Sequence, residues 1–177
     1  MLEELKKQPK RQLLLQAVSL GLIITSALMI WKGLILFTGS ESPVVVVLSG
    51  SMEPGFYRGD ILFLNQPAGI IEAGDIIVFN TDGREIPIVH RAIKIHQHSL
   101  MDISDVQLLT KGDNNWGDDR SLYPPGLMWL HRDHVMGKVV GFLSHIGRIT
   151  ILLNDYVWLK YLLIGTLGIF VLTSKDG

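Results

Sequence analysis

The chain of 177 residues contains no cysteine, and this absence excludes several classes of protein at once. Disulfide-stapled domains and zinc or iron–sulfur sites built on thiolates are not possible. An excess of basic residues is also missing, because 16 lysines and arginines stand against 17 acidic residues and the net charge is −1. Nothing in this balance suggests the clustered basic face of a nucleic-acid-binding protein, so we expect no nucleic-acid partner.

Charge is missing altogether from a long stretch near the N-terminus. Residues 13–37 are apolar except for Gln16, Lys32 and small or hydroxyl residues. About 20 apolar residues span a bilayer as a helix. The run is longer than the apolar core of a cleaved signal peptide, and no clean small-residue cleavage site follows it. We therefore expect an uncleaved transmembrane signal anchor over residues 13–37, with the lipid bilayer as a partner.

The charges on either side of this anchor predict its orientation. Four basic residues lie between positions 6 and 11, whereas only Lys32 and Glu41 surround the exit of the helix. By the positive-inside rule, residues 1–12 form a cytosolic N-terminus. The domain that follows the anchor is then expected on the far side of the membrane.

Between the anchor and residue 145 the chain consists of short apolar runs separated by turn residues. Gly-Asp pairs precede two of these runs, which is typical of turns that lead into strands. The candidate strands cover residues 61–64, 76–79, 85–96, 106–110 and 135–140. The region has no convincing amphipathic helix. We expect a mainly β fold, a small barrel-like or sandwich-like domain, over residues 38–156.

The C-terminal region is apolar again but short. Lys160 is the only charge between residues 157 and 172, and about a dozen apolar residues follow it, fewer than the roughly 20 that span a bilayer. These residues would surround a helix instead of forming one stripe, which favours membrane contact over packing on a core. We expect a short apolar helix and tail over residues 157–177.

A valine-rich run ends at a serine pair and is the stretch most suggestive of chemistry. The run predicts a buried strand, because branched side chains pack well on a pleated surface. Its residues are Val44, Val45, Val46, Val47 and Leu48, followed by Ser49, Gly50 and Ser51. Glycine allows a sharp turn that leaves a hydroxyl at the exit of the sheet. That setting suits a nucleophilic serine, although an ordinary polar turn has the same sequence.

A serine nucleophile needs a base, and histidine is suited to that role near neutral pH. Of the six histidines, His90 is the best placed, at the end of an apolar strand-like run. His96 and His98 could be a metal fragment, but without a third ligand at informative spacing we expect a solvated hairpin tip.

Three carboxylates within seven positions could orient such a histidine. They belong to Asp113, Asp118 and Asp119, in a segment that reads as a polar loop. A calcium loop is the alternative, since Asp113, Asn115 and Asp119 carry hard oxygen ligands, but their spacing does not match an EF-hand. From the residues alone, an anchored β-domain hydrolase is a plausible hypothesis.

Five motifs in one order carry a resemblance to a known family. They are Ser49-Gly50-Ser51-Met52-Glu53-Pro54, Arg58-Gly59-Asp60, residues 74–79, residues 88–91 and residues 111–120. Together they resemble the signal peptidase I family, in particular its eukaryotic members of the endoplasmic reticulum. The resemblance covers nearly the whole chain. It implies a membrane-anchored serine endopeptidase that uses no cofactor or metal.

The resemblance also implies a role for each residue of a site. Ser51 would be the nucleophile, and His90 stands where bacterial members carry a lysine base. Asp119 would orient His90, with Asp113 as a rival for that role or a supporting residue. Ser49 and the N–H of Ser51 would contribute to the oxyanion hole.

The substrate of this family is a signal peptide in extended form, with small residues at the first and third positions before the scissile bond. We expect it to add as a strand beside residues 44–48. The resemblance implies that accessory subunits of a complex are further partners. With the C-terminal helix they would form a thinned membrane region that rejects long apolar helices.

Two other hypotheses remain open. The enzyme could use a lysine base, for which Lys94 and Lys111 are candidates. A non-catalytic anchored domain that binds nascent peptides or scaffolds other subunits is the second. The sequence does not decide on physical grounds between Asp113 and Asp119.

Overall fold

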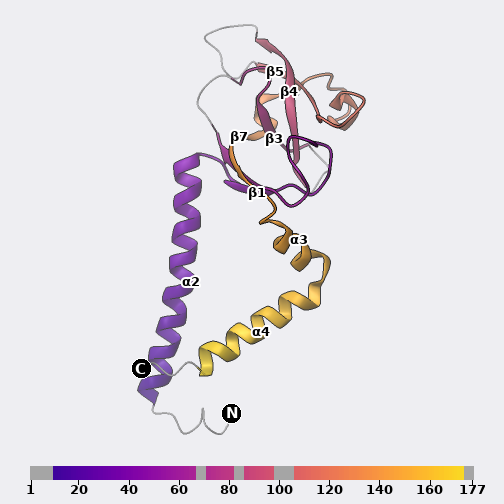
Figure 1. Ribbon diagram of the computed structural model, residues 1–177. Helices are drawn as coiled ribbons and strands as arrows, with labels where there is room; N and C mark the ends of the chain where they lie inside the picture. The colour runs from indigo at the N-terminus through magenta and orange to yellow at the C-terminus, as the bar shows by residue number, and fades with distance from the viewer. Residues whose placement is uncertain (1–9, 67–70, 82–85, 98–105, 174–177) are drawn as a thin grey trace.

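A β-rich domain lies at one end of the molecule, and two apolar helices extend away from it on the same side (Figure 1). The computed structural model describes residues 10–66, 71–81, 86–97 and 106–173. The first helix, α2 (Lys10–Thr38), contains the expected anchor. Among the described residues it is the one helix long and apolar enough to cross a membrane, with a mean hydropathy of 2.2 over its most apolar window.

Seven antiparallel strands of the described residues form a single curved sheet. They are β1 (Val44–Val46), β2 (Ile61–Asn65), β3 (Ile76–Phe79), β4 (Ile88–Gln97), β5 (Val106–Lys111), β6 (Leu130–His131) and β7 (Val135–Leu143). Their order is β1-β2-β7-β3-β4-β5-β6, so β7 returns to lie between β2 and β3. Register shifts in three of the pairings mark irregularities that bend the sheet into a half-barrel. The predicted mainly β fold with two apolar helices is confirmed.

The sheet buries two apolar clusters, one on each face of β3. Successive side chains of a strand point to opposite faces. Accordingly, Ile77 joins the cluster of β3 to β6, whereas Val78 joins the cluster beneath β1 and β2. The second cluster also contains Met52, which is fully buried and directly follows Ser51. The serine turn is therefore anchored in the core by its next residue.

The valine-rich strand differs from its prediction. Regular pairing covers only Val44–Val46, and these residues are half-buried, while Leu48 is 44% exposed. The reason is that β1 is an edge strand, bonded to β2 and free along its other side. Val47 is the one buried residue of the run, held by its N–H bond to Asp60 O at 2.9 Å.

The C-terminal region holds an element that the sequence patterns did not reveal. A helix of eight residues, α3 (Arg148–Asp155), precedes the apolar helix α4 (Val157–Thr173). It lies within residues 38–156, for which a mainly β fold was expected, and follows residue 145, where the stretch of expected strands ends. Ile151 is its one buried residue, and eight residues are too few for a helical period to be recognised from sequence.

Two smaller expectations are also resolved. His96 lies within β4, paired with Gln107, and its ring packs edge-on against Trp129 at 4.4 Å between centroids, so the expected hairpin tip is wrong for this residue. The strand expected over residues 85–96 begins instead at Ile88. His98, residue 85 and parts of the two expected terminal segments lie outside the described residues.

Candidate active site

Ser51 occupies a turn that leaves the end of the β1 segment, and two hydrogen bonds from one residue fix that turn. The backbone N–H of Asn114 donates to Ser51 O at 2.8 Å, and the Asn114 side-chain amide donates to Gly50 O at 3.1 Å. With Met52 buried on the other side, the backbone around Ser51 is held at both flanks. Its hydroxyl is thereby presented at the edge of the sheet.

His90 approaches this hydroxyl from β4. Its Nε2 lies 3.1 Å from Ser51 Oγ, although the two residues are 39 positions apart in the chain. The side chain is only 4% exposed, and its ring packs edge-on against Phe79 of β3. Pairing of β4 with β3 sets His90 opposite Ile77. This register fixes the position of the imidazole along the sheet, beside Ser51.

Asp119 binds the other nitrogen of this imidazole. Its Oδ2 lies 2.6 Å from His90 Nδ1, and the carboxylate side chain is 1% exposed. Because a carboxylate only accepts hydrogen bonds, the proton lies on Nδ1. The Nε2 of a neutral imidazole is then free to accept the hydroxyl proton of Ser51. Asp119 is placed by the short 3-10 helix η1 (Asp119–Leu122), which it begins.

Two buried hydroxyl groups support Asp119, and sequence reasoning missed both. Thr110 Oγ1 donates to Asp119 Oδ2 at 2.6 Å and lies 2.9 Å from the phenol oxygen of Tyr123. Since the hydroxyl of Thr110 has one proton, which goes to Asp119, the phenol is the donor in the second bond. The N–H of Thr110 donates to the same phenol oxygen at 2.8 Å. Burial raises the pKa of Tyr123, which therefore keeps its proton at neutral pH.

Gly112 allows the close approach of the two segments. A side chain there would place its Cβ 2.8 Å from His90 Nε2 and 2.8 Å from Ser51 O. Real Cβ atoms do not tolerate such distances, so only glycine leaves room for the contact between His90 and Ser51. The motif around Gly112 was noted from sequence, but nothing local signals this packing role.

Asp113 has a different partner from Asp119. Its carboxylate accepts two hydrogen bonds from Arg91, at 2.9 Å from Nε and 2.7 Å from Nη2. The charge-assisted bond to Arg91 holds the pKa of Asp113 below its ordinary value, and the same bond raises the pKa of Arg91. Arg91 Nη1 also donates to Gly74 O at 2.8 Å. Asp119 is therefore the hydrogen-bond partner of the His90 imidazole, and Asp113 is the partner of the neighbouring Arg91 guanidinium.

The remaining candidates divide between the site and its surroundings. Ser49 Oγ lies 3.2 Å from Ser51 Oγ, close enough to share a reacting group. The amine of Lys111 donates to Gly112 O at 3.2 Å, and no hydrogen bond joins it or Lys94 to Ser51 among the described contacts. Within the described ranges, no cluster of three potential metal-ligating side chains occurs.

Comparison with known proteins decides the family. Human signal peptidase complex catalytic subunit SEC11C is 54% identical over 174 residues, which cover 98% of this chain and 89% of that protein. The Dictyostelium discoideum subunit sec11 is 52% identical over 95% of this chain and 92% of its own. The Schizophyllum commune subunit SEC11 is 48% identical over 94% and 93%. The chain belongs to the family of signal peptidase complex catalytic subunits.

Two family descriptions match separate parts of this serine peptidase. Residues 21–105 match the Peptidase S24-like family, and residues 148–173 match the signal peptidase C-terminal short helix. The second match spans α3 and α4 together. The helix that the local patterns did not reveal is therefore part of a feature shared with signal peptidases.

The peptidase has a groove of about 700 Å³ along the free side of β1. Ser51 and His90 line it, together with Ser49 and with residues 86–89 from the start of β4 and the segment before it. Of the valine-rich run, Val45, Val46, Val47 and Leu48 line this groove. Val44 instead lines a smaller hollow with Leu34 and Phe37 at the end of α2.

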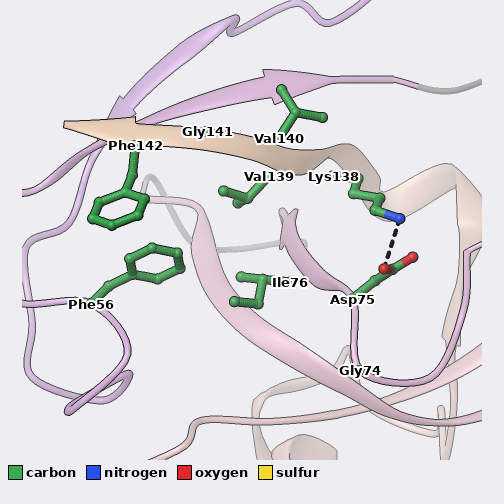
Figure 2. Close-up of a pocket in the computed structure, with 9 residues that line it drawn as sticks. All are labelled: Phe56, Gly74, Asp75, Ile76, Lys138, Val139, Val140, Gly141 and Phe142. Atoms are coloured by element: carbon green, nitrogen blue, oxygen red, sulfur yellow. Dashed lines mark ion pairs between the residues drawn. The ribbon is translucent and has the colours of Figure 1, made fainter.

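A second hollow lies apart from the groove that contains Ser51, between β7 and residues 74–76 at the start of β3 (Figure 2). Its volume is about 300 Å³. An ion pair of 2.7 Å between Asp75 and Lys138 closes one end, and the rings of Phe56 and Phe142 meet edge-on at the other. None of Ser51, His90 and Asp119 lines this hollow. The larger groove is the better candidate for the active site.

Proposed function

We propose that this chain is a membrane-anchored serine endopeptidase that cleaves N-terminal signal peptides from secretory and membrane proteins as they enter the endoplasmic reticulum. Ser51, His90 and Asp119 form its catalytic arrangement. The observation that carries the proposal is the continuous chain of hydrogen bonds from Ser51 to His90 and on to Asp119, at 3.1 Å and 2.6 Å, in the wall of a groove.

The reaction follows from these contacts. His90 Nε2 takes the hydroxyl proton as Ser51 Oγ attacks the carbonyl carbon of the scissile bond, and Asp119 stabilises the resulting imidazolium. His90 then gives the proton to the leaving amine, and the C–N bond breaks to leave an acyl-enzyme on Ser51. Water, activated by His90, hydrolyses the ester and regenerates the serine.

The oxyanion of each tetrahedral intermediate needs donors held in place beforehand. We assign this role to the hydroxyl of Ser49 and the backbone N–H of Ser51. The Ser49 hydroxyl is 3.2 Å from the nucleophilic oxygen, and thus within reach of an oxygen on the carbon that it attacks. Asn114 supports both donors by fixing the turn between them.

The substrate binds by strand addition to the free edge of β1. Main-chain pairing beside residues 44–48 would align the signal peptide, with Val45 to Leu48 on one wall of the groove and residues 86–89 on the other. Main-chain pairing of this kind does not discriminate between substrate side chains. Selectivity for small residues before the scissile bond then comes from the shallow pockets of the walls.

We place the chain in the endoplasmic-reticulum membrane as a single-pass type II protein. Residues 1–12 are cytosolic, residues 13–37 cross the bilayer, residues 38–156 form the lumenal peptidase domain, and residues 157–177 form a short apolar helix and tail. At about 1.5 Å per residue, the 17 residues of α4 reach only about 26 Å, less than the roughly 30 Å of a hydrocarbon core. With accessory subunits of the complex, α4 fits a thinned bilayer region.

The proposal is tested by cleavage of a signal-peptide-bearing precursor by the full chain, assembled with its complex in membranes. Ser51→Ala should abolish cleavage, while Ser144→Ala, on an exposed residue after β7, should not change it. A non-catalytic domain that scaffolds other subunits predicts instead that Ser51→Ala is silent. Cleavage at the wild-type rate by Ser51→Ala would overturn the proposal.

A further inference from the structure

Helix α3 contributes one wall of the groove that contains Ser51. Thr150, Ile151 and Asn154 line this groove together with Ser51 and His90. Thr150 and Asn154 are four residues apart and therefore share one face of the helix. Both are exposed, whereas Ile151 between them is buried against the domain. The polar pair thus presents a hydroxyl and an amide to the space that a bound peptide would occupy.

The start of α3 is packed tightly against the strand segment that leads to the serine turn. A side chain at Gly147 would place its Cβ 2.8 Å from Val46 Cγ1 and 2.9 Å from Gly59 O. Gly59 has a positive φ of 96°, and a side chain there would overlap Arg148. Two glycines therefore let the helix approach β1 more closely than any other residues would allow.

A buried carboxylate holds the connection in place. Asp60 is almost fully buried, and its two oxygens accept hydrogen bonds from different segments. Oδ2 accepts from the N–H of Tyr57 and Oδ1 from the N–H of His145, both at 2.9 Å. His145, with φ of 65°, lies in the linker between β7 and α3. These contacts make α3 a fixed part of the groove and not a loose connection to α4.

The position of α3 indicates which part of a substrate it would face. Helix α4, which continues from α3, and α2 leave the domain on the same side (Figure 1). A signal peptide has its apolar segment before the scissile bond, so its upstream residues come from that side. Gly147 abuts Val46, three residues before Ser49, which is roughly 10 Å at about 3.3 Å per residue. This distance corresponds to about three extended residues, and Thr150 and Asn154 lie further along α3 than Gly147.

We infer that Thr150 and Asn154 form a subsite for the substrate residues about three to five positions before the scissile bond, on the side of the apolar segment. Their hydroxyl and amide groups can bond the backbone or polar side chains of an extended peptide. The subsite makes α3 a specificity element of the peptidase. This inference rests on the proposed function.

The absence of cysteine from the chain permits a direct test by disulfide cross-linking. Single cysteines would replace Thr150, Asn154 or Leu152 in the full-length Ser51→Ala variant, which retains the precursor. Leu152 is the matched control, because it is exposed on the same helix but does not line this groove. The precursor carries one cysteine, moved from three to eight positions before the scissile bond. A cysteine in place of Leu48 is the positive control, because it should cross-link to a precursor that is bound beside the serine turn.

The subsite predicts cross-links from positions 150 and 154 to precursor residues three to five before the scissile bond, at least tenfold more than from position 152. Equal cross-linking from position 152 would overturn the subsite. So would an absence of cross-links from positions 150 and 154 when position 48 does cross-link. Either result would leave the proposed function standing. Failure of position 48 as well would overturn the proposed binding mode and, with it, the subsite.

A kinetic measurement provides an independent readout. Wild type should cleave peptides with five residues before the scissile bond several-fold better, in kcat/KM, than peptides with three. Thr150→Trp should remove that difference, and a Tm close to that of wild type would show that the variant is folded. Leu152→Trp should behave as wild type. A Thr150→Trp variant that behaves as Leu152→Trp on both peptides would contradict the inference.

Discussion

Thr110 and His90 donate hydrogen bonds to the same oxygen of Asp119, each at 2.6 Å. The shared acceptor means that the hydroxyl of Thr110 helps to set the position and orientation of the carboxylate against the imidazole. Tyr123 completes the arrangement, since its phenol donates to Thr110 and accepts from the N–H of Thr110. The proposed catalytic residues are therefore supported by a second pair of hydroxyl groups, both buried.

Thr110→Val should lower kcat with little change in KM, because it removes a donor to Asp119 without touching the groove. We expect about a tenfold loss, the effect of one hydrogen bond of roughly 1.4 kcal/mol. Thr110→Ser keeps the hydroxyl and should restore most of the rate. Steady-state kinetics on a precursor peptide measures both variants, and an unchanged kcat in Thr110→Val would show that the hydroxyl does not position Asp119.

Asp119→Asn should have a much larger effect. An amide can present its N–H to the imidazole and favour the wrong tautomer, which costs about 10⁴-fold in kcat in serine peptidases with this arrangement. Asp113→Asn should lower kcat far less, because Asp113 bonds Arg91 and not the imidazole. Single-turnover rates of the two variants, compared side by side, check the assignment. The reverse order of effects would make Asp113 the partner of His90.

Gly112→Ala should impair catalysis without disturbing the apolar core. The new methyl group would meet His90 Nε2 and Ser51 O at 2.8 Å, so the imidazole and the hydroxyl must move apart. Misplacement of reacting groups by about 1 Å costs on the order of 100-fold. Precursor cleavage measures the loss, and Gly117→Ala, where nothing lies within 4 Å of an added Cβ, is the matched control. Equal activity of the two variants would refute the packing argument.

The ion pair between Arg91 and Asp113 should make stability depend on pH in acid. The folded-state pKa of Asp113 is lowered relative to an ordinary aspartate, whose pKa is about 3.9. Its contribution to stability is therefore fully present above that ordinary value and is lost as the pH falls through the lower folded value. The difference in Tm between wild type and Asp113→Asn should be constant from about pH 7 to 5 and shrink below about pH 4. A difference independent of pH would mean that the charge is not involved.

Asp60→Asn should loosen the connection between the β-domain and α3. One of the two acceptor oxygens becomes an amide donor that faces the N–H of Tyr57 or His145. Leaving such a buried group unsatisfied costs about 1–3 kcal/mol. We expect a lower Tm and faster proteolysis of residues 144–147. Unchanged proteolysis of this linker would show that Asp60 does not hold it.

The strands could be predicted because their signals are local. The apolar runs of β2, β3 and β5 and the Gly-Asp turns before β2 and β3 are readable within a few residues. The extent of β1 could not be predicted, since its half-buried state depends on being an edge strand. Helix α3 could not be recognised because its eight residues are too few to show a helical period in the sequence, and its packing on Gly59 and Val46 is tertiary.

In the candidate site, too, residues with a local signal could be predicted and residues placed by tertiary contacts could not. Ser51 and His90 were suggested by their places at the ends of apolar runs. Asp119 was named by motif alone, because its contact with His90 joins residues 29 positions apart through the register of β4 and β5 and the turn of η1. Thr110 and Tyr123 carried no signal, since a hydroxyl side chain acquires its role here only from its buried neighbours.

The central claim is that His90 is the base for Ser51. Precursor cleavage by the assembled protein, wild type beside His90→Ala and His90→Lys, tests it most directly. The account predicts that wild type cuts and that both variants are inactive, because a lysine cannot reproduce the bond from Nδ1 to Asp119 together with that from Nε2 to Ser51. Cleavage by His90→Ala at near the wild-type rate would contradict the account and direct the search to a lysine base or another active subunit.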